Sequence, residues 1–150
     1  MRNIAIIALL LACVSVAGNA GNRKEFDLMK QENMKMKDKA EIYLAGGCFW
    51  GTEHFLKQIR GVEQTEVGYA NSQVPNPTYK EVCTGNTGAV ETVKVVYDPR
   101  TVDLDLLLDL YFQTIDPTSV NRQGGDSGLQ YRTGIYYIDK DDAPVIEAAI

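Results

Sequence analysis

The chain has 150 residues, enough for one domain, and its 45% hydrophobic content is sufficient for a buried core. Its net charge is −5 with acidic and basic residues interspersed, which argues against nucleic-acid binding. After the N-terminal apolar run, no long apolar segment follows that would predict a membrane-spanning helix.

Residues 1–20 are typical of a targeting segment. Arg2 supplies a positive charge, and the apolar run Ile4 to Leu11 is too short to span a bilayer. The sequence Leu10-Leu11-Ala12-Cys13 resembles a bacterial lipobox, in which the cysteine carries a lipid anchor, whereas Gly18-Asn19-Ala20 fits ordinary cleavage after Ala20. Both alternatives predict an exported protein of the periplasm or cell envelope, which touches a membrane only if Cys13 is lipidated.

Residues 21–40 are polar and lysine-rich, and they predict a tether that leads into a single domain at residues 41–150. The elements expected in that domain are a strand at Glu41–Ala45, a helix at Phe49–Arg60, strands at Val62–Tyr69 and Val90–Tyr97, a leucine-rich helix at Asp103–Thr114, a strand at Gly134–Ile138 and a helix from Ala143 to Ile150. This order is βαββαβ plus a helix. It predicts an α+β fold, a two-layer α/β sandwich with a ferredoxin-like core and a mainly antiparallel sheet.

Two long loops interrupt this pattern, at Ala70–Gly88 and Asp116–Arg132. The first contains one predicted turn of helix at Thr78–Val82. Loops of this length inside a compact domain are usually functional or disordered. We therefore expect these two segments to carry whatever chemistry the domain performs.

Cys48 is the candidate nucleophile, because it follows Gly46-Gly47 where a strand is predicted to turn into a helix. The glycines allow a sharp turn, and backbone N–H groups at a helix start favour a thiolate. The alternative is a small buried hydrophobe at a strand end. With Cys13 lipidated or removed, only Cys83 accompanies Cys48 in the domain, which is too few cysteines for a disulfide framework.

Glu91 is the candidate acid. Strand alternation places it on the same face as Val93 and Val95. If that face is inward, burial raises the pKa of the Glu91 carboxyl and keeps it protonated as a general acid; if it is outward, Glu91 is an ordinary surface acid. The single histidine, His54, lies six residues after Cys48 and points away from it on a helix, which disfavours a Cys–His hydrolase, and the lack of Cys-x-x-Cys makes a zinc site improbable.

The segment Gly47-Cys48-Phe49-Trp50-Gly51-Thr52-Glu53 resembles the signature of the peptide methionine sulfoxide reductase A family. The resemblance runs from about Glu41 to the end of the chain through Gly68-Tyr69, Asn76-Pro77-Thr78-Tyr79, Val82-Cys83-Thr84-Gly85, Glu91, Tyr97-Asp98-Pro99, Asp116-Pro117-Thr118, Asn121-Arg122-Gln123-Gly124 and Asp126-Ser127-Gly128-Leu129-Gln130-Tyr131-Arg132.

The resemblance implies reduction of methionine S-sulfoxide, in proteins and as free methionine, and hence repair of oxidised proteins under oxidative stress. It implies that Cys48 attacks the sulfoxide sulfur and becomes a sulfenic acid. Glu91 would protonate or hydrogen-bond the sulfoxide oxygen with help from Tyr79 and Tyr131, and Asp126 would orient that network.

Phe49 and Trp50 would accept the substrate methyl group, on the same resemblance. No bound cofactor or metal is implied, and a thioredoxin-type external thiol would regenerate the enzyme. The chain departs from the family pattern at Ala89, where a histidine is usual, and it lacks C-terminal resolving cysteines. It is therefore expected either to lack a C-terminal part or to rely directly on an external thiol. The alternative function is a non-catalytic binder of oxidised methionine peptides, and Cys83 is interpreted as a structural residue.

Overall fold

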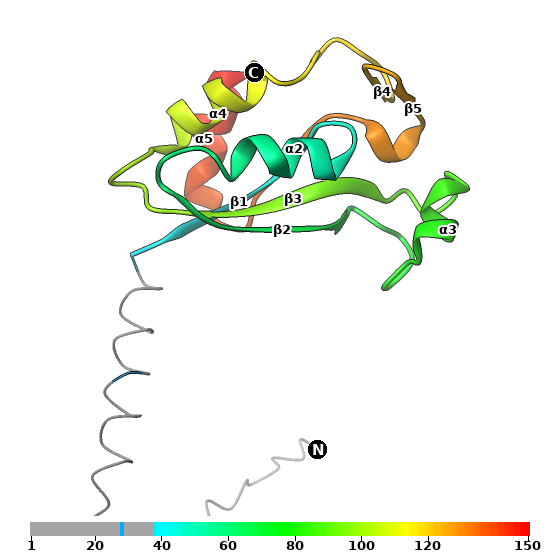
Figure 1. The fold of residues 1–150 in the computed structure, drawn as a ribbon, viewed down its shortest axis with the longest axis horizontal. Coiled ribbons are helices and arrows are strands. Elements are labelled where there is room, and N and C mark those ends of the chain that lie inside the picture. Colours follow the sequence, from blue (N-terminus) through cyan, green and yellow to red (C-terminus); the bar gives the residue numbers. More distant parts are fainter. Residues whose placement is uncertain (1–27, 29–37) are drawn as a thin grey trace, which may run out of the picture. The chain divides into compact units, whose positions relative to one another are not determined.

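The computed structural model describes Leu28 and residues 38–150. Residues 38–150 belong to one compact unit, Met36–Ile150 (Figure 1). The predicted targeting segment at 1–20, and most of the predicted tether at 21–40, lie outside the described residues. Among the described residues, no helix is long and apolar enough to cross a membrane.

The elements follow one another in nearly the predicted order. They are β1 (Ala40–Ala45), α2 (Phe49–Leu56), β2 (Val62–Ala70), α3 (Tyr79–Cys83), β3 (Val90–Tyr97), α4 (Leu104–Phe112), β4 (Arg122–Gln123), β5 (Asp126–Ser127), the 3₁₀ helix η1 (Leu129–Tyr131), β6 (Gly134–Tyr136), the 3₁₀ helix η2 (Lys140–Asp142) and α5 (Ala143–Ala149).

The main sheet has the strand order β2-β3-β1-β6, and every neighbouring pair is antiparallel. This is the order that a split βαβ arrangement produces, since β3 pairs between β1 and β2. The predicted α+β sandwich with a ferredoxin-like core is confirmed.

Helices α2, α4 and α5 lie on one face of the sheet (Figure 1). Helix α4 presents an apolar stripe to that face, because its leucines recur at helical spacing. The buried residues that form the core are Ile42, Leu44, Leu56, Val93, Val95, Tyr97, Val102, Leu104, Leu107, Leu108, Tyr111 and Ile146. This core fixes the sheet and the helices as one rigid support for the loops.

Several predicted boundaries differ from the structure, most of them by one or two residues. Helix α2 ends at Leu56 instead of Arg60, because the next turns close by tighter i−3 hydrogen bonds before Gly61, whose φ is 104°. The predicted loop Asp116–Arg132 contains the β4–β5 hairpin, which turns at Gly124 with a φ of 55°. Strand β6 ends at Tyr136, two residues earlier than expected.

The first long loop contains α3, where one turn of helix is predicted. Thr78 caps this short helix, since its hydroxyl accepts from the Glu81 N–H while the Glu81 carboxylate accepts from the Thr78 N–H. The capping box therefore determines where Tyr79 begins the helix.

All the long loops meet at one end of the sheet. Strands β1 and β2 finish at this end, and the antiparallel strands β3 and β6 begin there. The register pairs Tyr69 with Glu91 and Ala45 with Gly134. The chain segments that follow or precede these residues carry every candidate site residue.

Candidate active site

Cys48 occupies the turn between β1 and α2 and is the residue immediately before the helix. Its side chain is partly exposed and its thiol is free. Gly47, one residue earlier, has a φ of 82°, and a Cβ placed there would lie 2.7 Å from the Gln123 Cβ. Only glycine fits both the backbone conformation and the space, so the turn depends on this residue.

Two buried hydroxyl groups donate hydrogen bonds to the backbone of this turn. The Thr52 hydroxyl donates to the Gly46 carbonyl at 2.9 Å and also lies 3.3 Å from the Cys48 carbonyl. The Tyr111 hydroxyl donates to the Ala45 carbonyl at 2.6 Å. Because both hydroxyls are buried, these hydrogen bonds compete little with water and fix the path of the chain into Cys48.

Glu91 lies on the inward face of β3 and is only 2% exposed. Strand alternation left open whether Glu91 faces inward or faces solvent, and the structure shows that it faces inward. The Phe49 N–H donates to Glu91 Oε2 at 3.0 Å, which joins the acid to the residue that follows Cys48. Burial raises the pKa of the Glu91 carboxyl, the Phe49 N–H opposes this shift, and the negative charge of Asp126 adds to it.

The two candidate tyrosines come from different loops. Tyr79 begins α3 with 60% of its surface exposed, and Tyr131 ends η1 and is half-buried. Hydrogen bonding to the Cys83 side chain, with a further contribution from Tyr131, raises the pKa of Tyr79 to about 12. The Tyr79 phenol therefore stays protonated near neutral pH, and Tyr131 is near enough to affect its pKa.

An aromatic row begins at Phe49, the residue that follows Cys48. The Phe49 ring centroid lies 5.8 Å from that of Trp50 and 5.8 Å from that of Tyr69. Phe49 also packs against the hydrophobic core, whereas Trp50 is 70% exposed. The row thus runs from a fixed inner ring to an outer ring that solvent reaches; none of the three rings lines the cavity at Cys48.

A cavity of about 280 Å³ opens at Cys48. Asp126 lines it from the β4–β5 hairpin and Thr52 from α2, with Gly46, Gly51, Thr114, Gln123 and Gly124 completing the lining. Asp126 is itself exposed. The candidate nucleophile and the candidate orienting acid therefore face one solvent-accessible space.

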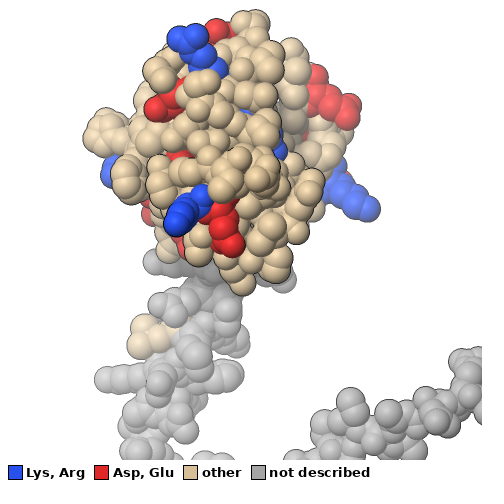
Figure 2. All heavy atoms as spheres, turned by 90° about the vertical axis from the view of Figure 1, so that its right-hand side faces the viewer, with Lys and Arg blue, Asp and Glu red and all other residues tan. Residues whose placement is uncertain are grey.

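Figure 2 shows the side of the molecule on which α3 and the β4–β5 hairpin lie. Most of its surface belongs to uncharged residues, with a few acidic and basic side chains between them.

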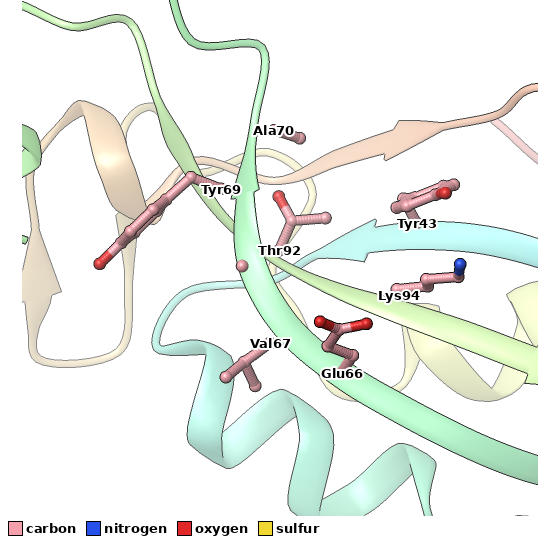
Figure 3. Close-up of a pocket in the computed structure, with 8 residues that line it drawn as sticks. Tyr43, Glu66, Val67, Tyr69, Ala70, Thr92 and Lys94 are labelled. Carbon is pink, nitrogen blue, oxygen red and sulfur yellow. The ribbon is translucent and has the colours of Figure 1, made fainter. Parts of the chain in front are cut away.

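A second hollow, of about 300 Å³, lies over the sheet around Thr92 (Figure 3). It exists because Gly68 pairs with Thr92 and has no side chain to fill the space. Lys94 and Tyr43 border it, with the lysine Nζ 5.9 Å from the Tyr43 ring centre and 3.0 Å from a Glu41 oxygen. The hollow contains neither Cys48 nor Glu91, and the site is not there.

His54 and Cys83, which were also considered from the sequence, are both exposed. His54 is exposed on α2, and Cys83 is exposed at the end of α3, outside the core that a structural residue would join. Within residues 38–150, no group of His, Cys, Asp and Glu side chains could hold a metal ion.

Arg132 and Gln123 have roles in the site that sequence reasoning did not assign. The Arg132 guanidinium donates to the Leu129 carbonyl at 2.8 Å and to the Gly88 carbonyl at 2.9 Å, which ties η1 to the loop before β3. Gln123 packs on Gly47. Both residues lie inside the motifs quoted above, but the contact of Arg132 with Gly88 and that of Gln123 with Gly47 join segments distant in sequence, and no local pattern reveals them.

Comparison with known proteins identifies relatives of this chain. A family model for peptide methionine sulfoxide reductase matches residues 40–150. The chain is 57% identical over 109 residues to the peptide methionine sulfoxide reductase MsrA of Lachnoclostridium phytofermentans. The aligned region covers 73% of this chain and 66% of that protein.

Solved structures agree. Methionine sulfoxide reductase A of Corynebacterium diphtheriae superposes with a TM-score of 0.71 at 42% identity, over 75% of this chain and 53% of that one. Mxr1 from Saccharomyces cerevisiae in complex with Trx2 superposes with a TM-score of 0.52 at 26% identity, over 75% of this chain and 66% of that one. The chain spans 53–66% of the length of these three relatives.

Proposed function

Because the chain belongs to the peptide methionine sulfoxide reductase family, we propose that it reduces methionine S-sulfoxide, in proteins and as the free amino acid, to methionine. One observation carries this proposal above the others. The residue that follows the free Cys48 thiol donates its N–H to the buried Glu91 carboxyl at 3.0 Å, so the candidate nucleophile and a buried acid are linked through one residue.

In the proposed reaction, the Cys48 thiolate attacks the sulfoxide sulfur. The sulfoxide oxygen takes up a proton and is transferred to Cys48, so that methionine leaves and the cysteine becomes a sulfenic acid. The substrate sulfur gains two electrons and the cysteine loses two, and oxygen is conserved. No bound cofactor takes part in this step.

Glu91 supplies the proton to the sulfoxide oxygen. Its burial supports this role, because a carboxyl with a raised pKa keeps its proton to higher pH than an ordinary carboxyl and can donate it as the S–O bond polarises. A second consequence of burial is that the developing charge is poorly screened, which strengthens each hydrogen bond to the oxygen.

Tyr79 and Tyr131 donate further hydrogen bonds to the sulfoxide oxygen in this proposal, and Asp126 orients the network. The influence of Tyr131 on the pKa of Tyr79 and the position of Asp126 in the Cys48 cavity support these roles. The two tyrosines belong to the two loops that close the site.

Phe49 and Trp50 form the surface that accepts the methyl group of the substrate. The tilted packing of their rings at the start of α2 supports this role, since an apolar wall would hold the methyl group while the oxygen turns toward Glu91. The largely uncharged face that carries α3 and the β4–β5 hairpin suits protein substrates of varied sequence (Figure 2).

An external thiol reductant of the thioredoxin type resets Cys48. Two thiol groups of the reductant become a disulfide, the sulfenic acid returns to a thiol, and water is released. The superposition with Mxr1 in complex with Trx2 supports such a partner. Repair of oxidised proteins is the cellular role that follows.

We further propose that the protein works in the periplasm or cell envelope after export through residues 1–20. Mass spectrometry of the mature N-terminus in its host tests this. A diacylated Cys13 indicates the lipid anchor, a start at Gly21 indicates ordinary cleavage, and an intact Met1 contradicts export.

A single-turnover assay tests the proposed function. Without reductant, the protein incubated with excess methionine S-sulfoxide should release one methionine per chain, and the R epimer should give none. Cys48→Ser should abolish release, whereas the exposed Cys83→Ser should not and serves as the matched control. Binding without release by the unmodified protein would instead show a non-catalytic binder of oxidised methionine peptides.

A further inference from the structure

We propose that Gln123 is a positioning residue, whose side chain fixes the β4–β5 hairpin, and with it Asp126, against the turn that holds Cys48. This inference rests on the proposed function for the reaction that it affects. It names a residue to which neither the motif nor the acid network assigns a role.

The amide group of Gln123 is bound twice by the backbone of one residue. The Asp116 N–H donates to Gln123 Oε1 at 2.8 Å, and Gln123 Nε2 donates to the Asp116 carbonyl at 2.7 Å. The side chain thus pairs with Asp116 as a neighbouring strand would, and it closes the loop between residues 116 and 123.

The methylene groups of Gln123 lie against Gly47. A Cβ placed on Gly47 would come within 2.7 Å of the Gln123 Cβ and 3.3 Å of its Cγ. The contact is therefore between the aliphatic part of the glutamine and bare backbone, one residue before the thiol. It exists only because position 47 has no side chain.

The hairpin links the position of Gln123 to the position of Asp126. Gln123 is the direct cross-strand partner of Asp126, and the two strands have only two residues each. So short a ladder has little stability of its own. Its position must come from outside contacts, and the Gln123 amide and methylene groups supply two of them.

Gln123 lines the same cavity as Cys48. The two hydrogen bonds to Asp116 fix the plane of its amide, so turning the amide toward a substrate would break both of them. The pH profile and the alkylation rate below distinguish positioning from a direct contact with substrate.

The test compares Gln123→Met with Gln58→Met. Methionine keeps the methylene groups over Gly47 but removes both hydrogen bonds to Asp116. Gln58 is the matched control, because it is an exposed glutamine whose amide donates to the His54 carbonyl at 2.6 Å, away from the hairpin. The measurements are the single-turnover rate across pH, the rate of Cys48 alkylation by iodoacetamide in a Cys83→Ser background, and the melting temperature.

Gln123→Met should slow the single turnover about 10- to 100-fold, the loss typical of a misplacement near 1 Å. It should also move the alkaline limb of the pH profile to lower pH. Glu91 is faced by Tyr69 and Asp126, and withdrawing the Asp126 charge removes one cause that keeps the pKa of Glu91 raised. Alkylation of Cys48 should become faster as the hairpin loosens, and the melting temperature should fall only slightly.

Three results would overturn the proposal. These are an unchanged rate, pH profile and alkylation rate in Gln123→Met; an equal loss in Gln58→Met; or a loss explained entirely by unfolding at the assay temperature. If the unsubstituted protein shows no reductase activity, the proposed function fails. The alkylation comparison then decides the role of Gln123 by itself.

Discussion

Replacing Glu91 with glutamine should slow sulfoxide reduction by about 100-fold or more. The amide keeps the shape of the carboxyl, and its oxygen can still accept the Phe49 N–H that Glu91 accepts at 3.0 Å. The ground-state packing is therefore retained, and what is lost is the proton. General acids contribute about 10² to 10⁴ in rate, which corresponds to about 3–5 kcal/mol of barrier. The amide can still donate a hydrogen bond, so the lower part of this range is expected.

The raised pKa of Glu91 also predicts the direction in which the rate changes with pH. The pKa of Glu91 is raised above 4.5 in the folded protein, so the rate of the unsubstituted protein should fall as pH rises through that pKa and the acid is lost. The same ionisation should weaken the fold: the stability that the protonated carboxyl contributes is present below its unfolded pKa and is lost as pH rises through the folded one. The Glu91→Gln variant should show neither change.

The assay is single-turnover methionine release over a pH series, with urea unfolding on the same samples. Glu66→Gln, on the exposed part of β2, is the matched control. A full rate in Glu91→Gln, or an alkaline limb identical with that of the unsubstituted protein, would refute the assignment of Glu91 as the acid.

Three further outcomes are expected. Tyr111→Phe removes the buried 2.6 Å hydrogen bond to the Ala45 carbonyl and should lower the free energy of unfolding by about 1–2 kcal/mol in urea titrations; an unchanged midpoint would contradict it. Asp103→Ala removes the cap on the Leu106 N–H and should cost about 1 kcal/mol, measured in the same way. Trp50→Ala should raise KM for peptide sulfoxides with no loss of stability, because the ring is 70% exposed; an equal fall in kcat would count against a binding role.

The strands and helices were predictable because each buries one regular face. The leucines of α4 recur at helical spacing, and the order of elements implies a split βαβ sheet, which the strand order confirms. The inward orientation of Glu91 was not predictable by period alone. Strand β3 begins with Val90, Glu91 and Thr92 all buried, so both faces of the strand are covered there and alternation carries no signal.

The residues that hold the Cys48 turn could not be predicted for a different reason. The Tyr111 hydroxyl reaches a carbonyl 66 residues earlier, and Gln123 rests on Gly47 from a strand of two residues. Contacts this distant leave no local pattern, and a two-residue strand is too short to show any period. Cys48 was a candidate because of its turn and was selected by the family resemblance, whereas no pattern in the sequence pointed to the residues that hold that turn.

The direction of β1 has a practical consequence for immobilisation. The chain enters the sheet at Ala40, which pairs with Tyr97, and reaches the Cys48 turn only after Ala45. Six extended residues separate these ends by about 17 Å. Anything joined ahead of Ala40, whether an acyl chain, a resin or a fusion partner, is therefore attached at the end of the strand remote from the thiol. A link made directly at Ala40 would hold the domain by the end of β1 opposite the Cys48 turn.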